Sequence, residues 1–160
     1  MYLHNKTATT VILSSWNRLN SLPGGIWIFN QLLRLFNPYS GSIHPMVREL
    51  RPGYARVELL DQRRIRNHLN SIHALALANL GELTSGLALL SGLPDNSRGI
   101  PVKITTEYFK KARGKLIAES TSGTADINKT TDYQVSADII DQQGDIVART
   151  VVDWRLELIE

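Results

Sequence analysis

The chain has 160 residues and a mildly basic net charge of +3. This length suits one domain with a substantial core, and the lack of a long Lys/Arg run argues against a nucleic-acid interface. The absence of cysteine excludes disulfides, thiol chemistry and cysteine zinc sites. No secretory leader is recognised and no apolar run reaches about 18 residues, so a cytoplasmic protein without a membrane span is expected.

The N-terminal region is predicted to form two helices. In residues 7–21 apolar side chains recur at the three-and-four spacing of one helix face. Pro23-Gly24-Gly25 ends this element, and a second helix is expected over residues 26–36. Its large apolar surface, which includes Trp27, is interpreted as packing against the domain. Contact with a membrane surface or a partner is the alternative, and Arg34 as its only cation weakens the membrane case.

Residues 67–92 contain the segment around which the rest of the chain is organised. A polar turn opens a helix that is apolar almost all the way round, so other elements must wrap it. Between Arg66 and Asp95 the only residue with a full charge is Glu82, in mid-helix. Burial disfavours the charged form of a carboxyl group, so a raised pKa is expected for Glu82.

The remaining elements are predicted to be strands. One precedes the central helix at residues 55–60, and four follow it at about residues 102–108, 115–120, 133–139 and 146–158. Apolar and polar residues alternate in three of these four, whereas residues 115–120 are short and mixed. Their short connections favour an antiparallel order. The prediction is an α+β fold in which a curved antiparallel sheet of about five strands wraps around a long central helix, with two N-terminal helices.

Three residues at the start of and within the central helix resemble the motif of hotdog-fold acyl-CoA thioesterases of the phenylacetate-degradation type. That motif places a His six residues after an Asn and an acid nine residues after the His, the spacings of Asn67, His73 and Glu82. Residues 107–115 are similar to the family's strand and turn after the helix.

A second similarity, to a thioesterase-like hotdog branch with an N-terminal helical extension, covers nearly the whole chain. It includes residues 22–25, 38–43, 66–68 and 73–82.

The resemblance implies one hotdog domain over residues 1–160, with residues 1–50 as the extension and 51–160 as the core. The implied activity is hydrolysis of an acyl thioester of coenzyme A or of an acyl-carrier protein, in a homodimer or a tetramer. Coenzyme A then enters as part of the substrate, and no other cofactor is expected. No metal is expected either, because no second ligand cluster supports a site formed by His68, His73 and Glu82.

The roles of the candidate site residues follow from thioester chemistry. Glu82 is the expected general base or nucleophile. The helix is expected to begin near Ser71, which leaves the backbone N–H groups of His73 and Ala74 as donors for an oxyanion. Asn67 either orients the water or the thioester carbonyl, or caps the turn before the helix. The His73 side chain is interpreted chiefly as a packing or capping group, with direct catalysis as the alternative.

Cations supply the candidate phosphate-binding groups for coenzyme A or a carrier protein's pantetheine arm. They are Lys103, Lys110, Lys111 and Arg113. The last three lie on a predicted hairpin turn, for which a solvated surface is the alternative. If Glu82 is structural instead of catalytic, Lys103 is its expected ion-pair partner.

The chain departs from the family pattern near the site. Ala74 and Leu75 replace two glycines, which changes the neck of the pocket. Pro101 stands where some relatives place a Ser or Thr that assists the attacking water. These departures motivate a non-catalytic acyl-CoA-binding module as the alternative function. An enoyl-thioester hydratase or dehydratase is less favoured, because those relatives carry Pro-Gly shortly before the helical carboxylate.

Overall fold

The computed structural model describes residues 8–123 and 130–159. Its N-terminal helices are α1 (Ala8–Leu19), α2 (Gly25–Phe36) and α3 (Pro38–Gly41). The first two strands, β1 (Met46–Arg51) and β2 (Tyr54–Leu59), lead through a short 3₁₀ helix, η1 (Arg63–Ile65), into α4 (Ala74–Gly92). The last four strands are β3 (Ser97–Tyr108), β4 (Leu116–Thr121), β5 (Thr131–Ile140) and β6 (Ile146–Leu158).

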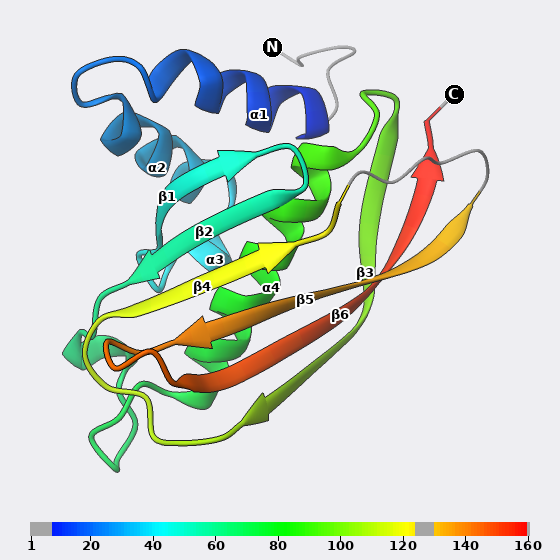
Figure 1. Ribbon diagram of the computed structural model, residues 1–160. Coiled ribbons are helices and arrows are strands. Elements are labelled where there is room, and N and C mark those ends of the chain that lie inside the picture. The colour runs from blue at the N-terminus through cyan, green and yellow to red at the C-terminus, as the bar shows by residue number, and fades with distance from the viewer. Residues whose placement is uncertain (1–7, 124–129, 160) are drawn as a thin grey trace.

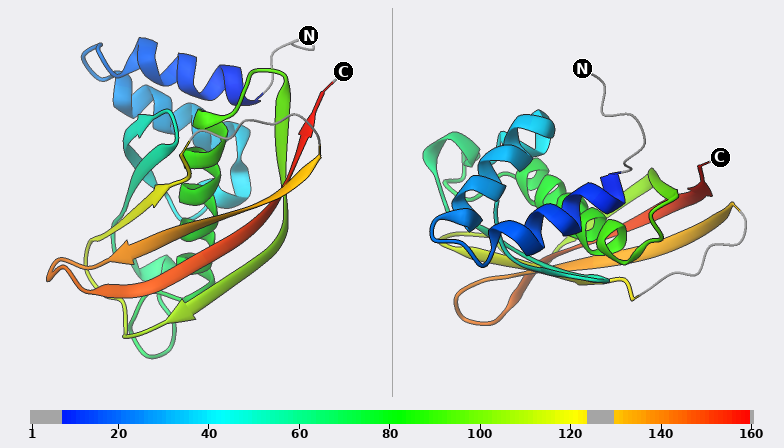
Figure 2. Two further views of the ribbon diagram at one scale, coloured as in Figure 1. Left: turned by 45° about the vertical axis from the view of Figure 1, so that its right-hand side comes forward. Right: turned by 90° about the horizontal axis from the view of Figure 1, so that it is seen from above.

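The strands form one antiparallel sheet in the order β1-β2-β4-β5-β6-β3. The sheet curves around α4, and the N-terminal helices lie on the same side of the sheet as α4 (Figures 1 and 2). The predicted α+β fold class is confirmed. The sheet has six strands, one more than the sequence pattern indicated.

The additional strand is β1, which crosses the boundary drawn at residue 50 between the extension and the core. Its register against β2 shifts between Val47 and Glu49. The shift breaks the period of two by which strands are recognised in a sequence. Alternation is intact in β6, where Val152, Trp154 and Leu156 are all buried as predicted.

The central helix is wrapped as its composition requires. Leu80, Ala88 and Leu89 are at most 1% exposed, and Gly81 lets the helix approach the Thr150 side chain on β6 closely. Among the described helices, α4 is long and apolar enough to cross a membrane, but 67% of the relevant window is buried inside the protein. Burial beneath the sheet accounts for its hydrophobicity.

The N-terminal helices attach to this core through a few buried groups. Trp16 of α1 meets Phe29 of α2 edge to face, with ring centroids 5.1 Å apart. The amide of Asn30 accepts from the Val47 N–H (2.6 Å) and donates to the Val47 carbonyl (3.2 Å), which ties α2 to β1. One face of α2 therefore packs against the domain as interpreted, while Trp27 on the other face is 61% exposed.

Candidate functional site

The turn before α4 is built around the side chain of Asn67. Its Oδ1 accepts hydrogen bonds from the Leu69 N–H (3.0 Å), the Ser71 N–H (3.2 Å) and the Ser71 hydroxyl (3.1 Å). The Asn67 oxygen therefore stabilises the turn, which is the capping role considered from the sequence. Its Nδ2 has no partner among the described residues and stays available as a donor.

The helix begins at Ala74 rather than near Ser71, with His73 as its N-cap. The ring Nδ1 of His73 accepts from the Leu75 N–H at 3.1 Å, which is a capping contact. The His73 N–H donates to the Ile65 carbonyl at 2.8 Å. This corrects the expectation that both backbone donors are free. Of the two, the Ala74 N–H is the one without a partner in the described part of the chain.

A cavity of about 250 Å³, called the Asn67 cavity, brings two potential donors together. Asn67 and Ala74 both line it, close to the positive end of the α4 dipole. Tyr108 of β3 forms part of the wall, and its hydroxyl donates to the Ala74 carbonyl at 3.0 Å. Two residues with an unpaired N–H donor among the described residues, the Asn67 amide nitrogen and the Ala74 backbone N–H, therefore border one hollow, and an oxyanion site requires such donors.

Glu82 lies in a different hollow of about 400 Å³, the Glu82 cavity. Its lining residues are Asn37, Tyr39, Ser40, Leu75, Ala78, Asn79, Glu82 and Ile104. Burial raises the pKa of the Glu82 carboxyl above its ordinary value, the direction expected from the sequence. The carboxylate forms no ion pair or hydrogen bond with any residue that the structure describes, Lys103 included.

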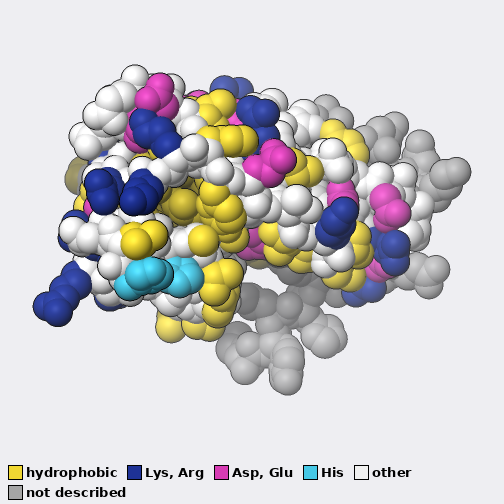
Figure 3. Space-filling view, turned by 90° about the horizontal axis from the view of Figure 1, so that it is seen from below, with side chains coloured by type: hydrophobic (Ala, Val, Ile, Leu, Met, Phe, Trp, Pro, Cys, Tyr) yellow, Lys and Arg dark blue, Asp and Glu magenta, His cyan; other side chains and the backbone are white. Residues whose placement is uncertain are grey.

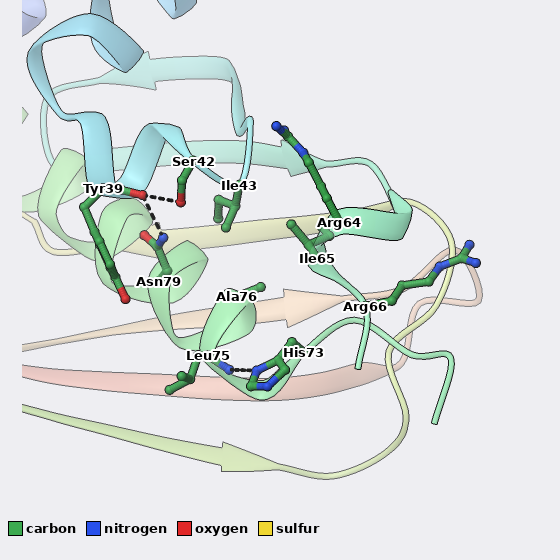
Figure 4. A pocket seen from close by; sticks show the side chains of 10 residues that line it. All are labelled: Tyr39, Ser42, Ile43, Arg64, Ile65, Arg66, His73, Leu75, Ala76 and Asn79. Atoms are coloured by element: carbon green, nitrogen blue, oxygen red, sulfur yellow. Dashed lines mark hydrogen bonds between the residues drawn. The ribbon is translucent and has the colours of Figure 1, made fainter. Parts of the chain in front are cut away.

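Figure 4 shows a third hollow of about 350 Å³, the His73 cavity, which by its shared lining residues adjoins the Glu82 cavity. The two share Tyr39, Leu75 and Asn79 as lining residues. Sequence reasoning missed Tyr39 and Asn79 as cavity residues. Asn79 carried a usable signal, because a residue three positions before Glu82 lies on the same face of a helix.

The cations at the β3–β4 turn are less free than the sequence implies. The Lys110 ammonium contacts Asp141 and Asp145, both at 2.6 Å. Arg113 donates to the backbone carbonyls of the turn before α4. Lys111 and Lys103, the latter on β3, are both exposed, and neither has a partner within the described ranges. Viewed from the end where α4 begins, basic and histidine side chains gather on one side of an apolar patch, and acidic side chains border its other side (Figure 3).

A family model described as "Domain of unknown function (DUF4442)" matches residues 25–156. The chain belongs to this family. The match runs from α2 into β6 and so includes α4 and all three cavities. No curated protein matches the chain significantly.

Solved structures similar to this DUF4442 protein share its architecture. The structural-genomics protein APC5556 is 28% identical, with a TM-score of 0.80 over 95% of this chain and 99% of its own. PA5026 from Pseudomonas aeruginosa, a probable thioesterase, is 21% identical, with a TM-score of 0.72 over 86% and 97%. A point mutant of the phenylacetic acid degradation protein PaaI from Thermus thermophilus is 16% identical, with a TM-score of 0.62 over 74% and 97%.

These similarities confirm the hotdog fold and the resemblance to thioesterase-family proteins of that fold. At such low identities a shared fold carries no catalytic residue from one protein to another. The roles of Glu82, Asn67, His73 and Ala74 therefore rest on the geometry of the cavities. Within the described residues no group of three or more His, Asp or Glu side chains is arranged to hold a metal ion.

Proposed function

We propose that this DUF4442 protein hydrolyses an acyl thioester of coenzyme A or of an acyl-carrier protein, with Glu82 as the general base. The observation that carries the proposal is the state of this carboxyl group. It borders a cavity, lacks an ion pair among the described residues, and has a pKa raised by burial. A base poised nearer to neutrality is efficient in proton transfer at the working pH.

The proposed reaction is a water attack on the thioester carbonyl. The water oxygen bonds to the carbonyl carbon while Glu82 takes one of its protons, and the carbonyl electrons move onto oxygen. Collapse of this oxyanion breaks the carbon–sulfur bond, and the proton on Glu82 passes to the leaving thiolate. The products are a carboxylic acid and a free thiol. Direct attack by the Glu82 carboxylate, through an anhydride, is the other role open to this residue.

The Asn67 cavity supplies the proposed oxyanion site. Its free donors, the Asn67 amide nitrogen and the Ala74 N–H, stabilise the negative oxygen that develops in the transition state. They line a different cavity from Glu82 in the same chain. We therefore propose that the complete site combines Glu82 of one protomer with Asn67 and Ala74 of a second copy.

The sheet offers an edge for such pairing. β3 is an edge strand of 12 residues with exposed apolar side chains on both faces. They include Ile100, Val102, Ile104 and Tyr108. Its register against β6 shifts between Pro101 and Lys103 and is regular from Lys103 to Tyr108. Such a regular edge segment is a template for strand addition, so pairing of this part of β3 with β3 of a second copy is the proposed dimer contact. The opposite edge, β1, has a bulge and is contacted by α1 and α2.

The experiment is hydrolysis of a panel of acyl-CoA and acyl-carrier-protein thioesters by wild type, Glu82→Gln and Glu49→Gln. Glu49 is a surface carboxylate on β1, the opposite edge of the sheet, and it lines none of the three cavities, which makes it a matched control. We expect the Glu82 variant to lose turnover and the Glu49 variant to keep it. Equal rates in wild type and Glu82→Gln would remove Glu82 from the mechanism.

A non-catalytic acyl-binding module is the second candidate, and Leu75 favours it. This side chain replaces a family glycine and lines both the Glu82 and His73 cavities, where it occupies space next to the base. Binding of acyl-CoA without turnover across the whole panel would support the module. Multiple turnovers with any thioester would exclude it.

A further inference from the structure

Asn79 carries a buried polar atom that the fold does not use. The residue lies on α4 and is 9% exposed, and its Oδ1 has no hydrogen-bond partner among the residues that the structure describes. Its Nδ2 donates to the Tyr39 carbonyl at 3.4 Å. Because that carbonyl only accepts, the amide nitrogen must face it, and the unsatisfied atom is the side-chain oxygen. Buried polar atoms without partners are rare in folded proteins and often mark functional sites.

The amide is also weakly held. A distance of 3.4 Å is beyond the usual range for an N–H···O bond. Rotation of the terminal amide that turns Oδ1 toward the cavity therefore breaks only this one weak hydrogen bond to the Tyr39 carbonyl. Figure 4 shows Asn79 beside Tyr39 at the wall that the Glu82 and His73 cavities share.

Asn79 and Glu82 are neighbours on one face of α4, and both line the Glu82 cavity. Side chains three positions apart on a helix have Cβ atoms about 5–6 Å apart. One water molecule about 2.8 Å from an oxygen of each side chain fits between two such groups. Both groups accept hydrogen bonds, so the water donates both of its protons and keeps its lone pairs for another contact.

We propose that Asn79 is a water-positioning residue, whose Oδ1 holds the attacking water beside Glu82. The inference rests on the proposed hydrolytic function and adds to it a second water-binding group. One water proton passes to Glu82, while the other stays on oxygen in a hydrogen bond to Asn79. The oxygen lone pair then faces the thioester carbonyl carbon and forms the new bond. Pro101, the strand position considered for such assistance, has no hydrogen-bonding side chain.

The test compares kcat and KM of wild type, Asn79→Ala, Asn79→Asp, Glu82→Gln and the control Asn17→Ala. Asn17 is an exposed amide residue on α1 that lines none of the three cavities. Loss of a water-holding contact is expected to lower kcat of Asn79→Ala by about hundredfold with little change in KM. Asn17→Ala is expected to stay close to wild type.

Two further readouts separate water positioning from a purely structural role. Hydroxylamine competes with water for the acyl group, so Asn79→Ala is expected to form a larger fraction of hydroxamate than wild type. In Asn79→Asp a second carboxylate beside Glu82 raises the pKa of the base, and the rise of kcat with pH should move to higher pH.

The outcomes distinguish the water-positioning role from the hydrolytic function itself. An active wild type, an inactive Glu82→Gln and a fully active Asn79→Ala would overturn the role of Asn79 and leave the hydrolase in place. A lower melting temperature of Asn79→Ala with an unchanged hydroxamate fraction would also overturn it, in favour of a structural role. A wild type without turnover on any thioester would overturn both proposals.

Discussion

Both halves of α4, residues 74–82 and 83–92, are rich in apolar residues, but their polar groups differ in whether they have hydrogen-bond partners. In the second half, the hydroxyl of Thr84 donates to the Leu80 carbonyl (2.7 Å) and that of Ser85 to the Glu82 carbonyl (2.9 Å). The Ser91 hydroxyl accepts from the Gly53 N–H (3.2 Å) and lies 2.9 Å from the carbonyls of Arg51 on β1 and Ala88 on α4, to either of which it donates. In the first half, the Ala74 N–H, the Asn79 Oδ1 and the Glu82 carboxylate have no partner among the described residues.

This difference separates stability from chemistry along one helix. Satisfied polar groups and close packing stabilise the fold, whereas unsatisfied groups beside cavities are free to bind a substrate or a water. The groups without partners all lie in the first half of the helix, whose residues line the three cavities. Mutations in the two halves are therefore expected to affect different measurements.

The largest effect on stability is expected from Leu89→Ala in the second half. Leu89 is 1% exposed, so its truncation leaves a cavity and is expected to lower the free energy of unfolding by about 2–5 kcal/mol. Leu75→Ala is the control, because Leu75 is 66% exposed and its removal is expected to change stability by less than about 0.5 kcal/mol. Urea denaturation of both variants measures the contrast, and similar midpoints would contradict it.

A smaller loss is expected from Gly81→Ala, at the junction of the two halves. The added Cβ would overlap the Thr150 side chain, and such overpacking costs about 1–3 kcal/mol. The better helix propensity of alanine offsets up to about 1 kcal/mol of this. Gly86→Ala is the graded comparison, since its Cβ would lie 3.1 Å from the Trp154 ring. Thermal melts should rank wild type first, Gly86→Ala second and Gly81→Ala third, and a reversed order would contradict the packing at Gly81.

The second half of α4 was also the easier half to predict. A helix that is apolar on all sides must be buried by other elements in water, and the alternating strands provide the sheet that buries it. The same logic identified Glu82, because a single charge in such a helix is conspicuous in a sequence. β1 was missed because a bulge disrupts its alternation.

The site was harder to predict because its properties depend on individual hydrogen bonds. The start of α4 was placed near Ser71, although the Ile65 carbonyl and the Asn67 side chain take the donors there and delay the helix to Ala74. Lys110 was counted as a free cation, whereas Asp141, distant in the sequence, is its partner. Such long-range contacts leave no periodic signal in the chain.

The third expected effect is a pH-dependent gain of stability in Glu82→Gln. Burial raises the pKa of Glu82, so the folded protein binds this proton more tightly than the unfolded chain. The free energy of unfolding therefore falls as pH rises from the ordinary carboxyl pKa through the raised one. Removing the charge should raise the melting temperature at about pH 8 and change it much less at about pH 4, where the carboxyl group is mostly protonated in both states.

Glu49→Gln is the control for the pH experiment, because the Glu49 side chain is 47% exposed and lies on β1, away from the proposed dimer contact. Its melting temperature is expected to differ little from that of wild type. A Glu82→Gln variant that is less stable than wild type at the higher pH would show that the carboxylate has a stabilising partner, such as a cation of a second copy. That outcome would show that Glu82 stabilises the structure instead of acting as a base.

The smallest expected effect concerns the cations beside the Asn67 cavity. Lys111 and Lys110 both line this cavity, but Lys110 is already paired with Asp141 and Asp145. A free ammonium attracts the phosphates of coenzyme A more strongly than one whose charge is already compensated. Lys111→Ala is therefore expected to raise KM for acyl-CoA by a few-fold, within the roughly 1 kcal/mol typical of exposed charges.

The Lys111 effect should shrink at high salt, because screening weakens attraction between exposed charges. It should also vanish for an acyl thioester of N-acetylcysteamine, which carries no phosphate, while kcat stays unchanged for both substrates. Lys110→Ala is the matched control and should change KM less than Lys111→Ala does. An equal rise of KM for the substrate without phosphate would mean that Lys111 acts on the shape of the cavity. The phosphates would then have to be bound by another group, for which exposed Lys103 on β3 is the next candidate.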